Sequence, residues 1–261
     1  SLGQLGKRCS SLQLQNNHLC SLPDAMCRLR ALVTLRLQDN QLASMPARIG
    51  RLERLVNLDV NNNQLAELPA SICELRSLQV LLLHDNQLVS LPTDIGRLSR
   101  LRTLTLTHNE LTALPASVGE LSSLKVLSLS NNKLEAEAIA LLGSLRALRQ
   151  LAISQNALSS LPDSICQLDA LETLDVHDNA IVHLPVAIGR MAGLKSLNAA
   201  GNKLEALPPS ICDLDGTALD FERNPLERPP MKIVKRGLAA IRNYFPHHGE
   251  WLPHGSHGGG L

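Results

Sequence analysis

Bulky aromatic residues are nearly missing from this chain. One Trp, one Tyr and two Phe occur among 261 residues, although 44% of the residues are hydrophobic. A globular domain of this length ordinarily uses aromatic side chains to fill irregular space in its core. A core made almost wholly of Leu therefore favours regular, repeated packing over an irregular globule.

Excess charge and long apolar runs are missing too. The chain has 25 Lys and Arg against 24 Asp and Glu, a formal net charge of +1. Nucleic acid binds to basic surfaces, so no nucleic-acid partner is expected. No apolar run approaches the ~18 residues of a membrane-spanning helix, so no transmembrane segment is expected. The chain has no Asn-x-Ser/Thr acceptor for glycans, which favours an intracellular, cytoplasmic protein.

What the chain does contain is a repeat. Its pattern, L-x-x-L-x-L-x-x-N-x-L, is clear in LVTLRLQDNQL (Leu32 to Leu42), and most copies continue as in LPASICEL (Leu68 to Leu75). Recurrence of this leucine-rich-repeat signature along the whole chain makes coincidence negligible. The repeat Asn residues are Asn17, Asn40, Asn63, Asn86, Asn109, Asn132, Asn156, Asn179, Asn202 and Asn224.

The repeat predicts the fold. Residues of the x-L-x-L-x portion alternate with period two, so the leucines point inward and the residues between them face out. Stacked copies form a parallel sheet, and the buried Asn amide is expected to bond the backbone of its own and the adjacent turn. We expect an α/β leucine-rich-repeat solenoid, a curved horseshoe with the parallel sheet on its concave face. Pro-fixed extended segments and short helices or 3-10 turns would form the convex face, and a C-terminal helix would cap the array.

One repeat departs from the rule. KLEAEAIALLGSLRAL (Lys133 to Leu148) is one residue longer than its neighbours and lacks the Leu-Pro pair. Glu, Ala and Leu dominate it, so a true α-helix is predicted there. It is either a hinge or partner-docking ridge, or a tolerated variant of the repeat.

The six cysteines do not predict a disulfide framework. Four of them, Cys27, Cys73, Cys166 and Cys212, occupy a slot that Gly fills in other repeats, where a small buried residue is suitable. Cys27 and Cys73 lie two repeats apart, as do Cys166 and Cys212. That is a distance of about 10 Å, beyond the ~7 Å limit for a disulfide. The cysteines therefore indicate a reducing compartment and inert rather than catalytic thiols.

Both ends of the chain depart from the repeat. From Met231 the apolar residues follow helical spacing, with Tyr244 and Phe245 expected in the core of a cap. The basic residues of this region could bind acidic lipids or an acidic partner, or could form the solvent-exposed face of the helix.

Near the start, LGQL resembles the close of a preceding repeat, so we expect a fragment or mature form whose array begins before Ser1. The expected domains are a solenoid of about ten repeats (1–228), a capping helix (229–245) and a flexible His- and Gly-rich tail (246–261).

Outward-facing strand residues are the candidate partner-binding surface. They form columns of mostly small polar side chains around an exposed apolar spot at Val80 and Leu82, and acidic residues gather toward the C-terminal end. Such a face suits a protein ligand. The candidate binding residues are Arg36, Asp59, Val80, Leu82, His84, Asp85, Thr105, His108, Asp175, His177 and Asp220.

The stretch LLLHDNQLVSLP (Leu81 to Pro92) also raises the question of chemistry, because His beside Asp is typical of catalytic and metal sites. A second His-Asp pair lies four repeats further on, about 19 Å away, so the two cannot share one centre. Asp59, His84, Asp85 and His108 come from three consecutive strands, yet nothing encloses them and no ligand motif appears. Without a G-x-S-x-G, H-E-x-x-H or phosphate-binding Gly loop, we expect no enzyme activity, no metal and no cofactor.

The 23-residue repeats with L-P-x-x-I-G-x-L resemble the Ras-group class of intracellular leucine-rich-repeat proteins, of the Shoc/Sur type. The ending NPLERPPMKIVKRGLAAIRNYF (Asn224 to Phe245) resembles the cap of the plant intracellular Ras-group proteins. The resemblance implies a monomeric, non-enzymatic scaffold that docks a protein such as a small GTPase or another signalling protein. The alternative is a recognition domain of a larger kinase, GTPase or ubiquitin ligase.

Overall fold

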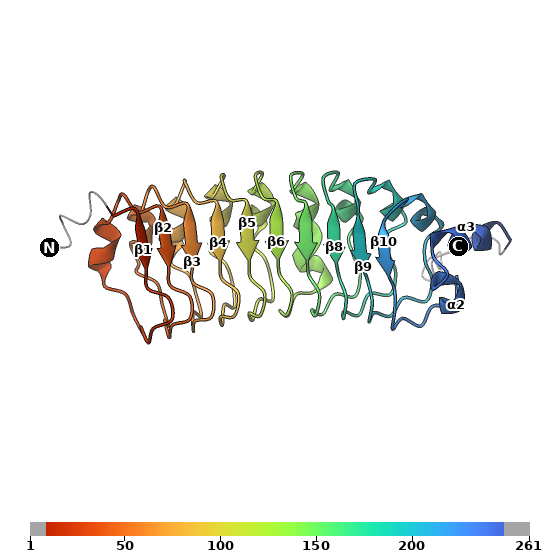
Figure 1. Cartoon of the computed structure of the whole chain (residues 1–261), viewed down its shortest axis with the longest axis horizontal. Coiled ribbons are helices and arrows are strands. Elements are labelled where there is room, and N and C mark those ends of the chain that lie inside the picture. The colour runs from red at the N-terminus through yellow and green to blue at the C-terminus, as the bar shows by residue number, and fades with distance from the viewer. Residues whose placement is uncertain (1–8, 248–261) are drawn as a thin grey trace, which may run out of the picture.

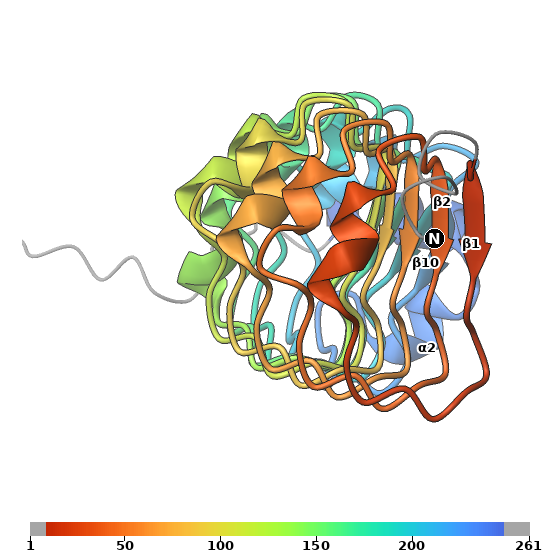
Figure 2. The same ribbon diagram turned by 90° about the vertical axis from the view of Figure 1, so that its left-hand side faces the viewer.

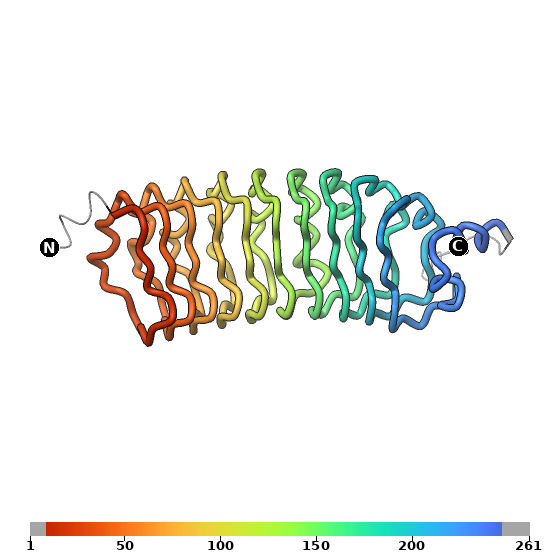
Figure 3. The backbone as a smooth tube through the Cα atoms, in the orientation of Figure 1, coloured from red at the N-terminus to blue at the C-terminus, as the bar shows by residue number. Residues whose placement is uncertain are grey.

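The computed structural model describes residues 9–247, which wind into a curved solenoid (Figure 1). Parallel strands follow one another in chain order across a single open sheet, and the backbone trace shows one similar turn per repeat (Figure 3). The solenoid predicted from the repeat is therefore confirmed. The strands are β1 (Ser11–Gln13), β2 (Thr34–Arg36), β3 (Asn57–Asp59), β4 (Val80–Leu82), β5 (Thr103–Thr105), β6 (Val126–Ser128), β7 (Gln150–Ala152), β8 (Thr173–Asp175), β9 (Ser196–Asn198) and β10 (Ala218–Asp220).

The sheet lines the concave side of the molecule. Viewed along the solenoid, β1 and β10 project further than the middle of the sheet, and the short helices lie on the opposite side (Figure 2). The central Leu of each inner strand points into the core, as Leu35 and Leu58 do at 0% exposure. The residues on either side of it face the concave surface. Leu12 and Leu219 in the outermost strands are only partly buried, because each lacks a neighbouring turn on one side.

Short 3-10 helices form the convex side. All of them except Ala136–Ser144 follow a segment held extended by Pro, as at Pro69, which has φ −65° and ψ 140°. The helices are η1 (Asp24–Arg28), η2 (Ile49–Arg51), η3 (Ala70–Glu74), η4 (Ile95–Arg97), η5 (Ala116–Glu120), η6 (Ala136–Ser144), η7 (Asp163–Gln167), η8 (Ile188–Arg190) and η9 (Pro209–Asp213).

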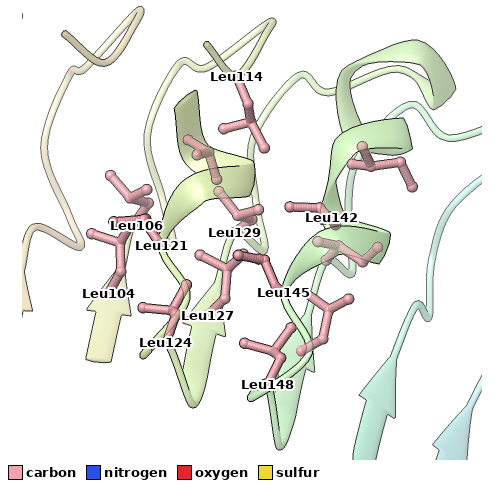
Figure 4. Close-up of a cluster of buried hydrophobic side chains, with 14 of the residues drawn as sticks. Leu104, Leu106, Leu114, Leu121, Leu124, Leu127, Leu129, Leu142, Leu145 and Leu148 are labelled. Atoms are coloured by element: carbon pink, nitrogen blue, oxygen red, sulfur yellow. The ribbon is translucent and has the colours of Figure 1, made fainter. Parts of the chain in front are cut away.

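The core between the two sides is one continuous stack of aliphatic side chains. In the close-up, Leu104 and Leu106 of one turn lie beside Leu127 and Leu129 of the next (Figure 4). All four are at most 1% exposed. Full burial of a Leu contributes about 1.5–3 kcal/mol, so each turn depends on its neighbours for most of its stabilisation.

The repeat Asn residues tie successive turns together, as predicted. Asn63 donates from Nδ2 to the carbonyl oxygens of Val60 and Asn61 in its own turn, at 3.0 and 3.1 Å. It also donates to the carbonyl of Leu37 in the preceding turn at 3.0 Å, while its Oδ1 accepts the N–H of Leu42 at 2.9 Å. One amide thereby satisfies backbone groups that would otherwise be buried without partners.

The irregular repeat does not contain the α-helix predicted for it. Ala136–Ser144 is a nine-residue 3-10 helix, η6. Its buried residues Ile139 and Leu142, and then Leu145, are three residues apart and all 0% exposed. A 3-10 helix aligns every third residue, so packing against η5 and η7 overrides the α-helical propensity of Glu, Ala and Leu.

The slot shared by Gly and Cys has a geometric explanation. A Cβ placed on Gly96 would lie 2.3 Å from the carbonyl oxygen of Ser117 in the next turn. That Ser also donates from its Oγ to the carbonyl of Thr93, so it is held against the slot. Cys73, in contrast, precedes a turn that has Asp94 in place of such a Ser and a shorter 3-10 helix. All six cysteines are free thiols, and Cys20 is exposed.

The C-terminal segment is helical, but not as one continuous helix. Helix α2 (Met231–Val234) is separated from α3 (Leu238–Tyr244) by Gly237 with φ +89°, and η10 (Phe245–His247) follows. Ile241 is buried against the last turns, and Phe245 is partly buried in the same cluster. Tyr244 makes an edge-on ring contact with Phe245, with ring centroids 5.9 Å apart.

Two sequence expectations fall outside the described residues: the preceding-repeat motif LGQL and the His-rich tail from residue 248 onward. Within residues 9–247, none of the helices combines the length and apolar character that a bilayer crossing requires.

Candidate protein-binding face

The strands bring the predicted inner residues into register. Arg36 pairs with Asp59, Asp59 with Leu82, and Leu82 with Thr105, each on the neighbouring strand. Because residues paired across a parallel sheet project from the same face, these four side chains form one row across β2 to β5. The complete row is Gln13, Arg36, Asp59, Leu82, Thr105, Ser128, Ala152, Asp175, Asn198 and Asp220.

A shallow depression lies in the N-terminal half of this face. Its volume is about 270 Å³, and Arg36, Asp59, Val80 and Leu82 line it together with Thr34 and Asn57. Val80 and Leu82 are half-exposed although apolar, and Arg36 is exposed beside them. An apolar floor with charged groups at its border is the arrangement found at the centre of protein interfaces.

Asp59 sits unfavourably in this depression. Burial raises the pKa of its carboxyl above the usual range, against the lowering effect of its hydrogen bond from the N–H of Asn61 and of the nearby His84 and Arg36. The hydrogen bond from Asn61 is 3.3 Å long. The ionised carboxylate is therefore partly desolvated without full compensation.

The first His-Asp pair is split between two different contacts. His84 Nδ1 lies 3.2 Å from Thr105 Oγ1 in the next strand. Asp85 Oδ1 lies 3.0 Å from Nδ1 of His108, one turn further on. Asp85 and His108 both have φ of 55°, in the left-handed turn that follows the strand. The adjacent residues His84 and Asp85 thus serve separate neighbours instead of one catalytic centre.

The second His-Asp pair belongs to a charged cluster near the C-terminal end. His177 Nδ1 lies 2.6 Å from Asp175 Oδ1, and its Nε2 lies 3.8 Å from Asp178 Oδ2. Arg223 of a later turn contacts Asp178 Oδ1 at 3.0 Å. Across residues 9–247, no three His, Cys, Asp or Glu side chains are grouped so as to hold a metal ion.

Asp220 lies further along, at the border of a second, more open groove of about 450 Å³. Met231 and Val234 of α2 form its apolar side. Glu222, another lining residue, contacts Lys235 at 3.6 Å. This groove joins the inner face to the C-terminal helices, which sequence reasoning treated as a cap with a basic surface.

Sequence reasoning also missed a basic column, formed by Arg102, Lys125 and Arg149. Each residue immediately precedes a strand and is exposed. The N–H of Lys125 donates to the carbonyl of Arg102, and that of Arg149 to the carbonyl of Lys125, both at 2.8 Å. Their spacing of one repeat is visible in the sequence, but their place one residue before each strand did not mark them as part of the inner face.

The chain is a solenoid repeat protein: its parallel strands are stacked, Asn side chains bond successive turns, and the inner face of the sheet is open. A family model described as leucine-rich repeat region matches residues 57–157 and 123–216, more than half of the chain. The chain therefore belongs to the leucine-rich-repeat family, whose members generally bind other proteins.

Solved structures of similar fold come from longer chains. The leucine-rich-repeat ectodomain of the Arabidopsis thaliana membrane receptor kinase GASSHO1/SCHENGEN3, in complex with CASPARIAN STRIP INTEGRITY FACTOR 2, is 30% identical with a TM-score of 0.76. The alignment covers 82% of this chain and 27% of that one. The PEPR1–AtPEP1 structure is 25% identical, with a TM-score of 0.71 and coverage of 82% and 35%.

A bacterial structure shares the fold alone. The functional domain of InlJ from Listeria monocytogenes is 21% identical with a TM-score of 0.71, covering 83% of this chain and 44% of that chain. None of the curated proteins compared with the chain matches it. The chain spans less than half the length of these three solved structures.

Proposed function

We propose that this chain is a non-enzymatic protein-interaction module that docks a protein partner on its concave face. The observation that carries the proposal is the half-exposed apolar pair Val80 and Leu82, set between Arg36 and Asp59 in a depression. Interface centres combine such apolar anchors with a polar border. The raised pKa of Asp59 supports the same placement, because this carboxylate weakens the isolated fold instead of stabilising it.

We further propose that the module is an intracellular, monomeric scaffold of the Ras-group class, with a small GTPase or another signalling protein as its partner. The repeat L-P-x-x-I-G-x-L supports this class. Six unpaired thiols support a reducing compartment.

A second candidate is a recognition domain within a larger enzyme. It is favoured by the lengths of the similar structures, since the chain covers only 27% of a receptor kinase ectodomain. The solenoid would then bind the partner in the same way and deliver it to a separate catalytic domain. The length of the complete gene product distinguishes the two candidates.

The docking face is tested by affinity capture with the intact chain and a Leu82→Arg/His84→Glu variant. Both side chains are half-exposed, so the substitutions should leave the fold intact, which circular dichroism checks. The control is Val186→Arg, which places the same Arg side chain as the Leu82 substitution on a residue 57% exposed beside the convex helix η8. We expect the double variant to lose captured proteins that the control retains. An identical captured set for all three chains would place the docking face elsewhere.

A further inference from the structure

The edge of the sheet where the strands begin changes character along the solenoid. Carbonyls of Val33, Val56, Gln79, Arg102, Lys125 and Arg149 each accept the N–H of the residue at the same place in the next turn. These residues therefore occupy neighbouring rungs, ~4.8 Å apart. The column is apolar or neutral up to Gln79 and then has three cations in succession.

Two of the three cations have no acidic partner among the residues that the structure describes. Arg149 Nη1 lies 2.7 Å from Glu172 Oε1, and the other oxygen of that carboxylate lies 2.6 Å from Lys195 Nζ. Among residues 9–247, no acidic side chain forms an ion pair with Arg102 or Lys125. Like charges on adjacent rungs of a sheet destabilise it, and a bound acidic group would relieve that repulsion.

The surface beside the basic column can admit a polypeptide segment. Thr103, Thr105 and Ser128 project from the adjoining strands, and all three are small and partly exposed. Their size leaves space above the sheet, and their hydroxyls can donate hydrogen bonds to carboxylates. Three cations spread over ~10 Å match two carboxylates of an extended segment, whose same-side residues are ~6.8 Å apart. Nucleic-acid binding sites commonly neutralise about six to ten phosphates, more than this column can contact.

Resting on the concave-face binding proposed above, we propose that Arg102, Lys125 and Arg149 form a docking edge for an acidic segment of the protein partner. The opposite edge has acidic residues toward its C-terminal end, including Asp178 and Glu222. Asp178 and Glu222 already contact the cations Arg223 and Lys235. The orientation of the partner is therefore set by attraction of its acidic segment to the basic edge.

A phage-displayed library of random twelve-residue peptides, selected on the intact chain, tests the charge preference directly. Selection runs in parallel on Arg102→Glu/Lys125→Glu and on Arg51→Glu/Arg190→Glu, whose charges lie on the convex helices η2 and η8. Both variants change the net charge equally, so only position distinguishes them. We expect Asp- and Glu-rich peptides from the wild type and the convex control, and their loss from the edge variant. An enriched acidic peptide, measured by fluorescence anisotropy, should bind the edge variant about tenfold more weakly or worse.

Absence of enrichment, enrichment without acidic residues, or equal enrichment on the edge variant would each overturn the proposal. Phosphatidylserine vesicles and duplex DNA serve as competing probes. Binding of either that depends on Arg102 and Lys125, without acidic-peptide binding, would reassign the edge. If Leu82→Arg/His84→Glu alters affinity capture while the edge variant does not, the docking face is supported and the role of the basic edge is refuted. If neither alters it, both proposals fall.

Discussion

Removing one amide from the Asn ladder is expected to weaken the solenoid far more than its size suggests. In Asn86→Ala, Nδ2 no longer donates to the carbonyls of Val60, Leu83 and His84, at 3.1, 3.1 and 3.3 Å. The Leu65 N–H loses its acceptor, the Asn86 Oδ1 at 3.0 Å. Asn86 is only 8% exposed, so water does not readily replace these bonds.

The size of this loss of stability depends on which backbone groups keep another hydrogen-bond partner. The Val60 carbonyl still accepts from Asn63 Nδ2, and the Leu83 carbonyl from Asn109 Nδ2, both at 3.0 Å. Leu65 N–H is left as a buried donor without an acceptor, at a cost of about 1–3 kcal/mol. Because these carbonyls keep another donor, the lost Nδ2 bonds together add only about 1 kcal/mol. The free energy of unfolding is therefore expected to fall by about 3 kcal/mol.

Urea denaturation followed by circular dichroism measures this loss, and Gln87→Ala is the matched control. Gln87 has the same amide group one residue away, but it is exposed and forms no side-chain hydrogen bond within the described residues. The control should change stability by less than about 0.5 kcal/mol. Hydrogen exchange should also show faster exchange at the Leu65 amide in Asn86→Ala alone. A loss in Asn86→Ala no larger than that of the control would refute the role assigned to the ladder.

Three further outcomes are expected. Gly96→Cys should lower the unfolding midpoint although Cys occupies this slot in other turns, because its Cβ would meet the Ser117 carbonyl at 2.3 Å; an unchanged midpoint contradicts the stacking geometry. Burial raises the pKa of the Cys166 thiol to about 11, so alkylation near pH 8, followed by mass spectrometry, should modify exposed Cys20 long before Cys166. Because burial raises the pKa of Asp59, its ionisation destabilises the folded chain fully above that raised pKa, and the effect disappears below the pKa of the same carboxyl in the unfolded chain. Asp59→Asn should therefore raise the unfolding midpoint near pH 7 but not near pH 3, and equal gains at both pH values would count against this explanation.

Most of the fold could be predicted because each repeat position has a single physical task. Alternation placed Leu35 and its equivalents inside, and the fixed spacing placed Arg36, Asp59 and Leu82 in one row, as the strand register confirms. The bonding of the repeat Asn followed from the need to satisfy backbone groups at the end of each strand. These predictions succeed because the same environment recurs in every turn.

The failures occurred where one turn differs from the next. Composition favoured an α-helix over Ala136–Ser144, yet the three-residue spacing of Ile139 and Leu142 fits the 3-10 helices on either side. Helical spacing after Met231 did not reveal the break at Gly237. The functional face was harder still, because contacts such as that between His84 and Thr105 join different turns and depend on side-chain conformation.

The two sides of the solenoid differ in how closely stacking restricts their residues. On the convex side, Ser117 donates a hydrogen bond to the turn before it and leaves no room for a Cβ at Gly96. The residue type in one turn therefore restricts the residue type in the neighbouring turn. Along the inner row, Arg36, Asp59 and Leu82 replace one another without changing the strand register. Stacking therefore does not explain why these side chains are present, and Asp59 even opposes it. The partner docking proposed above accounts for their presence, and Leu82→Arg/His84→Glu tests it directly.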